Sequence, residues 1–215
     1  MRSFKLLSLR VLVSLSCTNL PLVINSYDTQ SGEVQFQDDF SDPRSGWIRR
    51  YEEEIGNLDY VNQGYQIYVK QNHSLLWSGP GLQYTDVQIE VDATKIEGPD
   101  NNDFGVVCRA KDENNFYFLV ISSDGYYGIG KVRDGNQQLI GMDDLPPNEN
   151  ILQGQRTNHL RADCIEQNLS LFVNGIHLAT VQDTELTSGD AGLLAGTFDD
   201  PGTRIHFDNF SVLMP

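Results

Sequence analysis

Two alternating runs past the middle of the chain narrow its fold more than any other feature. In Asn158–Cys164 and in Asn168–Asn174, apolar side chains alternate with polar ones. A period of two residues is typical of a β-strand with one buried and one solvated face. The runs are separated by Glu166-Gln167, and Asn174-Gly175 precedes Ile176–Val181; both dipeptides suit two-residue hairpin turns. We therefore predict three consecutive antiparallel strands here.

The rest of the chain repeats this pattern. Asp86–Ala93 alternates strictly, which predicts an apolar face turned inward and an acidic face turned outward. Asn115–Ile121 is apolar on both faces and is predicted to be a central strand covered on each side. Short runs of this kind, separated by Gly, Pro, Asn and Asp, continue without helical periodicity. Residues 34–215 are therefore predicted to form one all-β domain, an antiparallel two-sheet sandwich.

The net charge of the chain limits the kinds of molecule that it is expected to bind. The chain has 215 residues and a formal net charge of −15. That charge disfavours nucleic acid and anionic membrane surfaces, because both would repel it. It is compatible with cations or with neutral partners such as glycans, and equally with an ordinary acidic, solvated surface.

The N-terminus indicates export. Residues 1–26 combine a basic start, an apolar middle and small residues, as secretory signal peptides do, and the polar residues 27–33 read as a tether. A lipid anchor at Cys17 is an alternative, although Ser14 stands where lipoprotein signals have Leu. No other stretch approaches the roughly 20 apolar residues that span a bilayer, so no transmembrane span is expected. The protein is expected to be secreted or held at the cell surface.

Cys108 and Cys164 follow the signal-like segment, and both share the parity of core-facing residues. Export permits a disulfide between them, but two buried free thiols explain the same pattern. No CxxC or nearby His pair accompanies them, which disfavours metal binding by these cysteines.

Five runs in a fixed order together resemble the concanavalin A-like jelly rolls of the laminin-G and 3-keto-disaccharide-hydrolase-like type. These runs are Asn114–Phe118, Asn158–Ala162, Leu171–Gly175, Gly189–Leu193 and Phe207–Phe210. The resemblance extends over about residues 35–213 and implies the jelly-roll fold. It implies less about function, because this fold carries lectins, glycan-binding modules, glycosidases and adhesion domains.

The candidate acids for glycosidase chemistry lie on and just after one predicted strand. Retaining hydrolysis needs two carboxyl groups about 5 to 5.5 Å apart. Jelly-roll glucanases carry a Glu-x-Asp-x-(x)-Glu pattern, and Glu90 and Asp92 match its first two acids. The next acid, Glu97, comes too late and would face the other side of a regular strand. We therefore predict no catalytic residues and an exported, non-catalytic sandwich that binds an extracellular glycan or a protein surface. The alternatives are a glycoside hydrolase of the 3-keto-disaccharide type and an adhesion or structural domain.

Candidate ligand contacts follow from sugar chemistry, in which aromatic faces meet the apolar side of a pyranose and polar groups orient its hydroxyls. The residues predicted to contact ligand are Glu90, Asp92, Trp77, Tyr117 and Tyr126. The resemblance also implies one structural Ca²⁺ between the last strand and the first ones, because hard cations take oxygen ligands. Asp208, Asp39 and the carbonyls near Gly46 are the residues predicted to hold it, with Asp38 as an alternative to Asp39.

Overall fold

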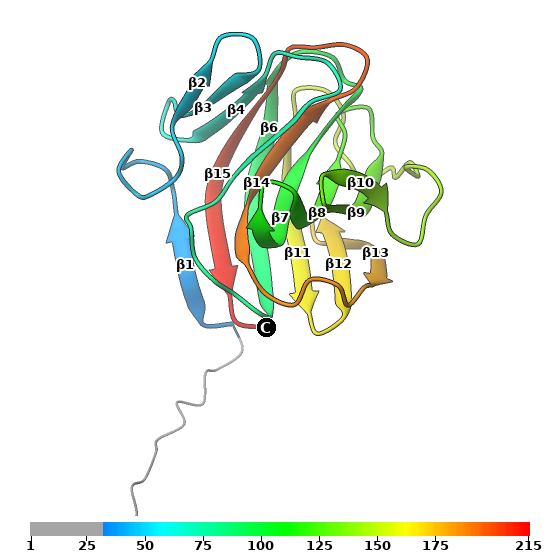
Figure 1. Ribbon diagram of the computed structural model, residues 1–215. Coiled ribbons are helices and arrows are strands. Elements are labelled where there is room, and N and C mark those ends of the chain that lie inside the picture. The colour runs from blue at the N-terminus through cyan, green and yellow to red at the C-terminus, as the bar shows by residue number, and fades with distance from the viewer. Residues whose placement is uncertain (1–31) are drawn as a thin grey trace, which may run out of the picture.

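The computed structural model describes residues 32–215 (Figure 1). The signal-peptide-like segment, Cys17 and residues 27–31 of the tether lie outside the described residues. Every regular element within residues 32–215 is a β-strand. None of the described residues form a helix long and apolar enough to cross a membrane.

The strands form two antiparallel sheets, as predicted. Sheet A has nine strands in the order β13 (Ile176–Gln182), β12 (Asn168–Val173), β11 (Thr157–Ile165), β6 (Val87–Glu97), β15 (Thr203–Leu213), β4 (Tyr65–Val69), β3 (Gly56–Tyr60) and β2 (Arg50–Glu52), with β1 (Val34–Asp38) also paired to β15. Sheet B has six strands in the order β10 (Asn136–Leu139), β9 (Tyr127–Arg133), β8 (Asn115–Ile121), β7 (Asn102–Asp112), β14 (Asp190–Thr197) and β5 (Leu75–Ser78).

The predicted three-strand run is confirmed as β11, β12 and β13. Ile165 pairs with Asn168, so Glu166-Gln167 forms the first hairpin turn. In the second turn Asn174 and Gly175 both have positive φ, at 52° and 81°. Such values at both central residues define the type I′ turn, whose twist matches that of the flanking strands.

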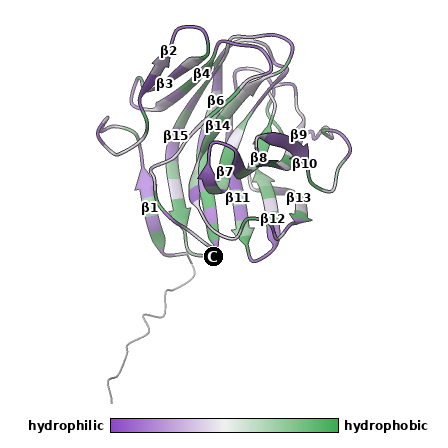
Figure 2. Ribbon diagram, viewed as in Figure 1, coloured by the Kyte–Doolittle hydropathy of each residue, from purple (hydrophilic) through white to green (hydrophobic). Residues whose placement is uncertain are grey.

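The core lies between the two sheets. In β6 the predicted inward residues, from Val87 to Ala93, are at most 2% exposed, while the alternate side chains of the strand are half-buried. Hydrophilic and hydrophobic residues succeed one another along the strands (Figure 2). The period-two pattern thus corresponds to one face of each strand packed on the opposite sheet.

Strand β8 is central in sheet B and covered on both faces, as predicted. Tyr117 and Leu119 join the core between the sheets, whereas Phe116 and Phe118 belong to a second apolar cluster. That second cluster lies on the outer face of sheet B. Trp77 of β5 packs against it, with its ring 5.7 Å from that of Phe116.

A disulfide joins the two sheets. It links Cys108 of β7 to Cys164 of β11, whose Cα atoms are 6.7 Å apart. The next residue, Arg109, has a φ of 52° and is only 3% exposed. Its guanidinium donates hydrogen bonds to the carbonyl oxygens of Thr85, Leu186 and Cys164 and to the carboxylate of Asp86. This arginine therefore ties together backbone groups of three segments beside the disulfide.

Candidate functional site

The residues predicted to contact ligand lie at different places. Tyr117 is fully buried between the sheets, where its hydroxyl donates a 2.5 Å hydrogen bond to Asp183. Burial raises the pKa of Tyr117 to about 12. The prediction that it contacts ligand is wrong. A strand that is apolar on both faces gives no indication from sequence of which aromatic residue reaches the surface.

Glu90 and Asp92 lie on the outer face of sheet A, but neighbouring side chains occupy their oxygens. His159 Nδ1 is 2.8 Å from Asp92 Oδ1, and Asn209 donates to Asp92 Oδ2 at 2.9 Å. Gln88 donates to Glu90 at 2.6 Å. These two acids are therefore part of a polar cross-strand array.

A β-bulge changes the position of Glu97. Pairing of β15 with β6 shifts between Arg204 and Ile205, so that Glu97 lies opposite Arg204. Glu97 accepts a 3.1 Å hydrogen bond from Arg204, and it faces outward, where a regular strand would turn it inward. At about 3.3 Å per residue, seven residues separate Glu97 from Glu90 by roughly 23 Å, far beyond the spacing of a retaining pair.

The residues predicted to bind calcium are only partly brought together. Asp39 lines a cavity of about 420 Å³ with Asp38 and Asn209, whereas Asp208 and Gly46 do not line it. Asp208 instead pairs in register with Asp92 on sheet A. Asp38 Oδ1 accepts a hydrogen bond from the backbone N–H of Phe40, and its Oδ2 is buried without a partner. Within residues 32–215 no group of three or more His, Cys, Asp or Glu could hold a metal ion.

Tyr126 stands between two neighbouring hollows at a loop-rich end of the sandwich. It is 39% exposed and lines one cavity of about 500 Å³ and another of about 570 Å³. Asp124 is shared by both, and His73 lines the first. The predicted ligand contacts at Tyr126 and at Glu90 and Asp92 thus belong to separate surfaces.

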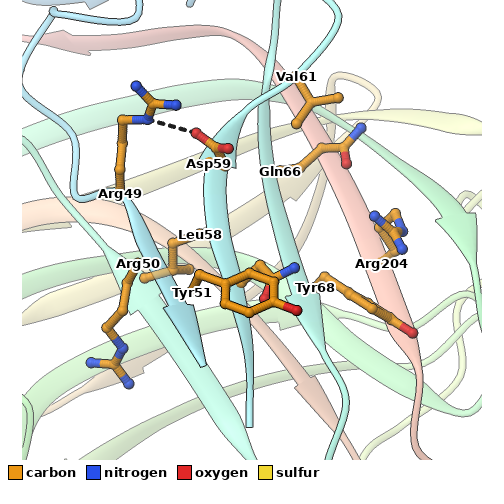
Figure 3. Close-up of a pocket in the computed structure, with 10 residues that line it drawn as sticks. Arg49, Arg50, Tyr51, Leu58, Asp59, Val61, Gln66, Tyr68 and Arg204 are labelled. Carbon is orange, nitrogen blue, oxygen red and sulfur yellow. Dashed lines mark hydrogen bonds and ion pairs between the residues drawn. The ribbon is translucent and has the colours of Figure 1, made fainter. Parts of the chain in front are cut away.

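A cavity of about 380 Å³ lies over β2, β3, β4 and β15 on sheet A, and Figure 3 shows its lining. Register pairing places one row of side chains across these four strands. Arg204 lies opposite Tyr68, Tyr68 opposite Asn57, and Asn57 opposite Tyr51. Leu58 and Ile67, which alternate with this row, are buried in the core. The alternation therefore directs two tyrosines, an amide and a guanidinium outward side by side.

The aromatic rings of this row differ in accessibility. Tyr51 is 72% exposed. The guanidinium carbon of Arg204 lies 3.9 Å from the centroid of the Tyr68 ring, so a cation covers one face of that ring. Lys70 Nζ lies 4.7 Å from the Tyr51 centroid. A cation therefore lies against one face of each ring, and Tyr51, as the more exposed of the two, supplies the accessible aromatic surface.

A second row completes the cavity lining. Gln66 lies opposite Asp59 and is 8% exposed. Arg49 precedes β2 and donates a 2.7 Å hydrogen bond from Nε to Asp59 Oδ1, which raises the pKa of Arg49. In the first row, Asn57 Oδ1 is buried without a hydrogen-bond partner. The cavity thus combines an exposed aromatic ring with convergent polar groups, the composition typical of small-molecule sites.

Comparisons with known proteins support the architecture. No family model and no curated protein matches the chain. Among solved structures, the carbohydrate-binding module CBM66 from Bacillus subtilis is 18% identical with a TM-score of 0.61, and the match covers 78% of this chain and 95% of that one. A B. subtilis protein of unknown function with a galectin-like fold has 14% identity and a TM-score of 0.61, with 86% and 97% covered. The fold is a concanavalin A-like jelly roll.

A third jelly-roll match belongs to a larger protein. The GH43 protein BlXynB from Bacillus licheniformis is 15% identical with a TM-score of 0.61; the match covers 84% of this chain and 39% of that one. At such identities the matches establish the jelly-roll fold, and the site must be argued from the residues of this chain.

Sequence reasoning did not find the row over the cavity of this jelly roll. None of Tyr51, Tyr68 and Arg204 is predicted from the sequence to contact ligand. A local signal was present, since Asn57, Asp59, Gln66 and Tyr68 share the solvated parity of their strands. What the sequence did not contain was the pairing of β4 with β15, which brings Arg204 beside Tyr68.

Proposed function

We propose that this chain is an exported, non-catalytic β-sandwich that binds extracellular carbohydrate in the cavity over β2, β3, β4 and β15. One observation carries the proposal: Tyr51, which is 72% exposed, lies in register with Asn57, whose side-chain Oδ1 has no hydrogen-bond partner. A pyranose offers an apolar face to such a ring and hydroxyl donors to such an oxygen.

Two of the structural neighbours agree with this proposal. One neighbour is a carbohydrate-binding module, and another is a GH43 protein. The volume of about 380 Å³ also falls within the range of small-ligand sites. Export is supported by the signal-like residues 1–26 and by the disulfide, a bond that persists in oxidising compartments.

Calorimetry after a glycan array would test the proposal. A ligand found on the array should bind Tyr51→Ala at least about tenfold more weakly than the wild type, because the substitution removes the open aromatic surface. Tyr126→Ala is the matched control, since Tyr126 is also an exposed tyrosine but lies in other cavities, and its affinity should be unchanged. Loss of binding in Tyr126→Ala alone would place the site at the loops. Absence of any glycan ligand would refute the function and favour a protein partner.

The hydrolase alternative is disfavoured by the geometry of its candidate acids, because Glu90 is bound by Gln88, Asp92 is bound by His159 and Glu97 is bound by Arg204. Incubation with a glycoside panel tests it directly. Product release that is abolished by Glu90→Gln and by Asp92→Asn would establish the enzyme and contradict the proposal.

A structural Ca²⁺ is proposed only for the cavity near β1. The unpartnered Oδ2 of Asp38 would be its first ligand, and Asp39 a second. If Ca²⁺ binds there, addition of Ca²⁺ after chelation should raise Tm, and Asp38→Asn should remove that response. A Tm that is the same in chelator and in Ca²⁺ would contradict the proposed ion.

A further inference from the structure

The cavity over β2, β3, β4 and β15 is rich in cations, although the chain as a whole is acidic. The net charge of the protein is −15. Among the residues that line this cavity, however, three arginines, Arg49, Arg50 and Arg204, stand against a single carboxylate, Asp59. A local excess of positive charge on an acidic protein attracts anions to that place and not to the surrounding surface.

The two arginines keep donors available for a ligand. Arg49 binds Asp59 through Nε at 2.7 Å, and Arg204 binds Glu97 through Nε at 3.1 Å. Each guanidinium carries four further N–H groups on its Nη atoms, and a pair of such groups fits a carboxylate bidentately. In the view of Figure 3, Arg49 lies at the left edge of the lining and Arg204 at the right edge.

Arg204 is the better placed of the two. Its side chain is 29% exposed, compared with 59% for Arg49, and it is stacked on Tyr68. Stacking on one side and the Glu97 pair on another restrict its rotamers, so less entropy is lost when it binds a ligand. Arg50 also lines the cavity but lies opposite the core residue Leu58, so it belongs to the other face of the sheet.

Asn57 limits the anion that can fit. Its buried Oδ1 has no partner among residues 32–215 and can only accept a hydrogen bond, so a ligand that brings a donor is favoured. Sulfate offers acceptors alone and would leave this oxygen unsatisfied. A neutral sugar would satisfy Asn57 but leave Arg204 facing no anion. A sugar acid carries both groups on one ring.

We propose, resting on the carbohydrate-binding function above, that the ligand is a uronic-acid residue of an acidic glycan. Its ring lies on the open surface of Tyr51, a hydroxyl donates to Asn57 Oδ1, and its carboxylate accepts from the Nη groups of Arg204. Arg49 and Lys70 add longer-range attraction.

Paired oligosaccharides test the inference. The probes are trimers of galacturonate and of glucuronate, each with its methyl-esterified form, which keeps the ring and removes the charge. One acid trimer should bind at least about tenfold more tightly than its ester, and its affinity should fall as NaCl rises. Arg204→Gln should remove most of this difference, and Arg204→Lys should restore only part of it, because an ammonium cannot bind bidentately.

The matched control is Arg44→Gln. Arg44 is an arginine paired with Asp42 whose side chain is 86% exposed, and it does not line the cavity, so affinity should not change. If Arg204→Gln fails to fold by circular dichroism, Arg49→Gln replaces it and should weaken binding of the acid trimer selectively. Equal binding of acid and ester, or binding of neutral glycans alone, would overturn the inference while leaving carbohydrate binding intact. Binding of none of these probes or any array glycan would refute the function and the inference together.

Discussion

Breaking the Cys108–Cys164 disulfide should cost a large share of the stability of the domain. The bond closes a loop with a sequence separation of 56 residues. In the chain-entropy model, a loop of that length restricts the unfolded state by about 4 kcal/mol. For a domain of this size, 1 kcal/mol corresponds to about 2–4 °C, so Tm should fall by about 10 °C.

Guanidinium chloride unfolding of the oxidised and the reduced wild type is the direct assay. Reduction keeps both sulfur atoms, so it isolates the cross-link from packing. The slope of the unfolding free energy against denaturant should also increase, because the reduced unfolded chain exposes more surface. The double variant Cys108→Ala/Cys164→Ala should lose slightly more than the reduced protein, since both cysteines are fully buried and their sulfur atoms pack in the core.

A loss below about 1 kcal/mol on reduction, with no change in slope, would refute this reasoning. It would mean that the unfolded chain is already restricted by something other than the disulfide. A double variant as stable as the reduced wild type would further show that the packing of the two cysteine side chains contributes little to stability.

Three further substitutions have expected outcomes. Arg109→Met should lower the free energy of unfolding by about 3 kcal/mol in denaturant titrations, because it leaves several buried carbonyl oxygens without donors; a loss under 1 kcal/mol would contradict the contacts described. Burial raises the pKa of Asp103 from 3.8 to about 7, so the folded state holds a proton that the unfolded state has lost, and the contribution of this group to stability falls as pH rises from about 4 to about 7. Asp103→Asn should remove that decline from Tm measured across pH, and an unchanged profile would exclude Asp103 as its source. Gly130→Ala would place a Cβ 2.2 Å from Cζ of Phe118 and 2.5 Å from the backbone oxygen of Gln138, so Tm should drop by several degrees, while an unaltered Tm would show that both the ring and the neighbouring strand can move aside.

The fold could be predicted because its signals are local. Alternation in Val87–Ala93 reports which face of β6 is buried, and Asn174-Gly175 specifies the turn that follows β12, whatever the distant chain does. These features depend on a few consecutive residues. They can therefore be read from the sequence without knowing which distant strands pair.

The site could not be predicted in the same way, because it depends on which strands become neighbours. Tyr51 and Arg204 line the same cavity only because β4 pairs with β15, which is distant in the sequence. The bulge that turns Glu97 toward Arg204 has no signature in a strand that otherwise alternates. Tyr117 was misassigned for the opposite reason: β8 is apolar on both faces, so parity does not distinguish its inner aromatic residue from its outer ones.

The arrangement of β2, β3 and β4 has a practical consequence. Apart from Arg204, the lining described comes from a short continuous stretch, Arg49–Tyr68, whose alternate residues such as Leu58 and Ile67 anchor it to the core. Outward positions can therefore be randomised without disturbing the anchoring ones. New binding specificities could therefore be selected by varying the outward residues of Arg49–Tyr68 while the rest of the domain is kept unchanged.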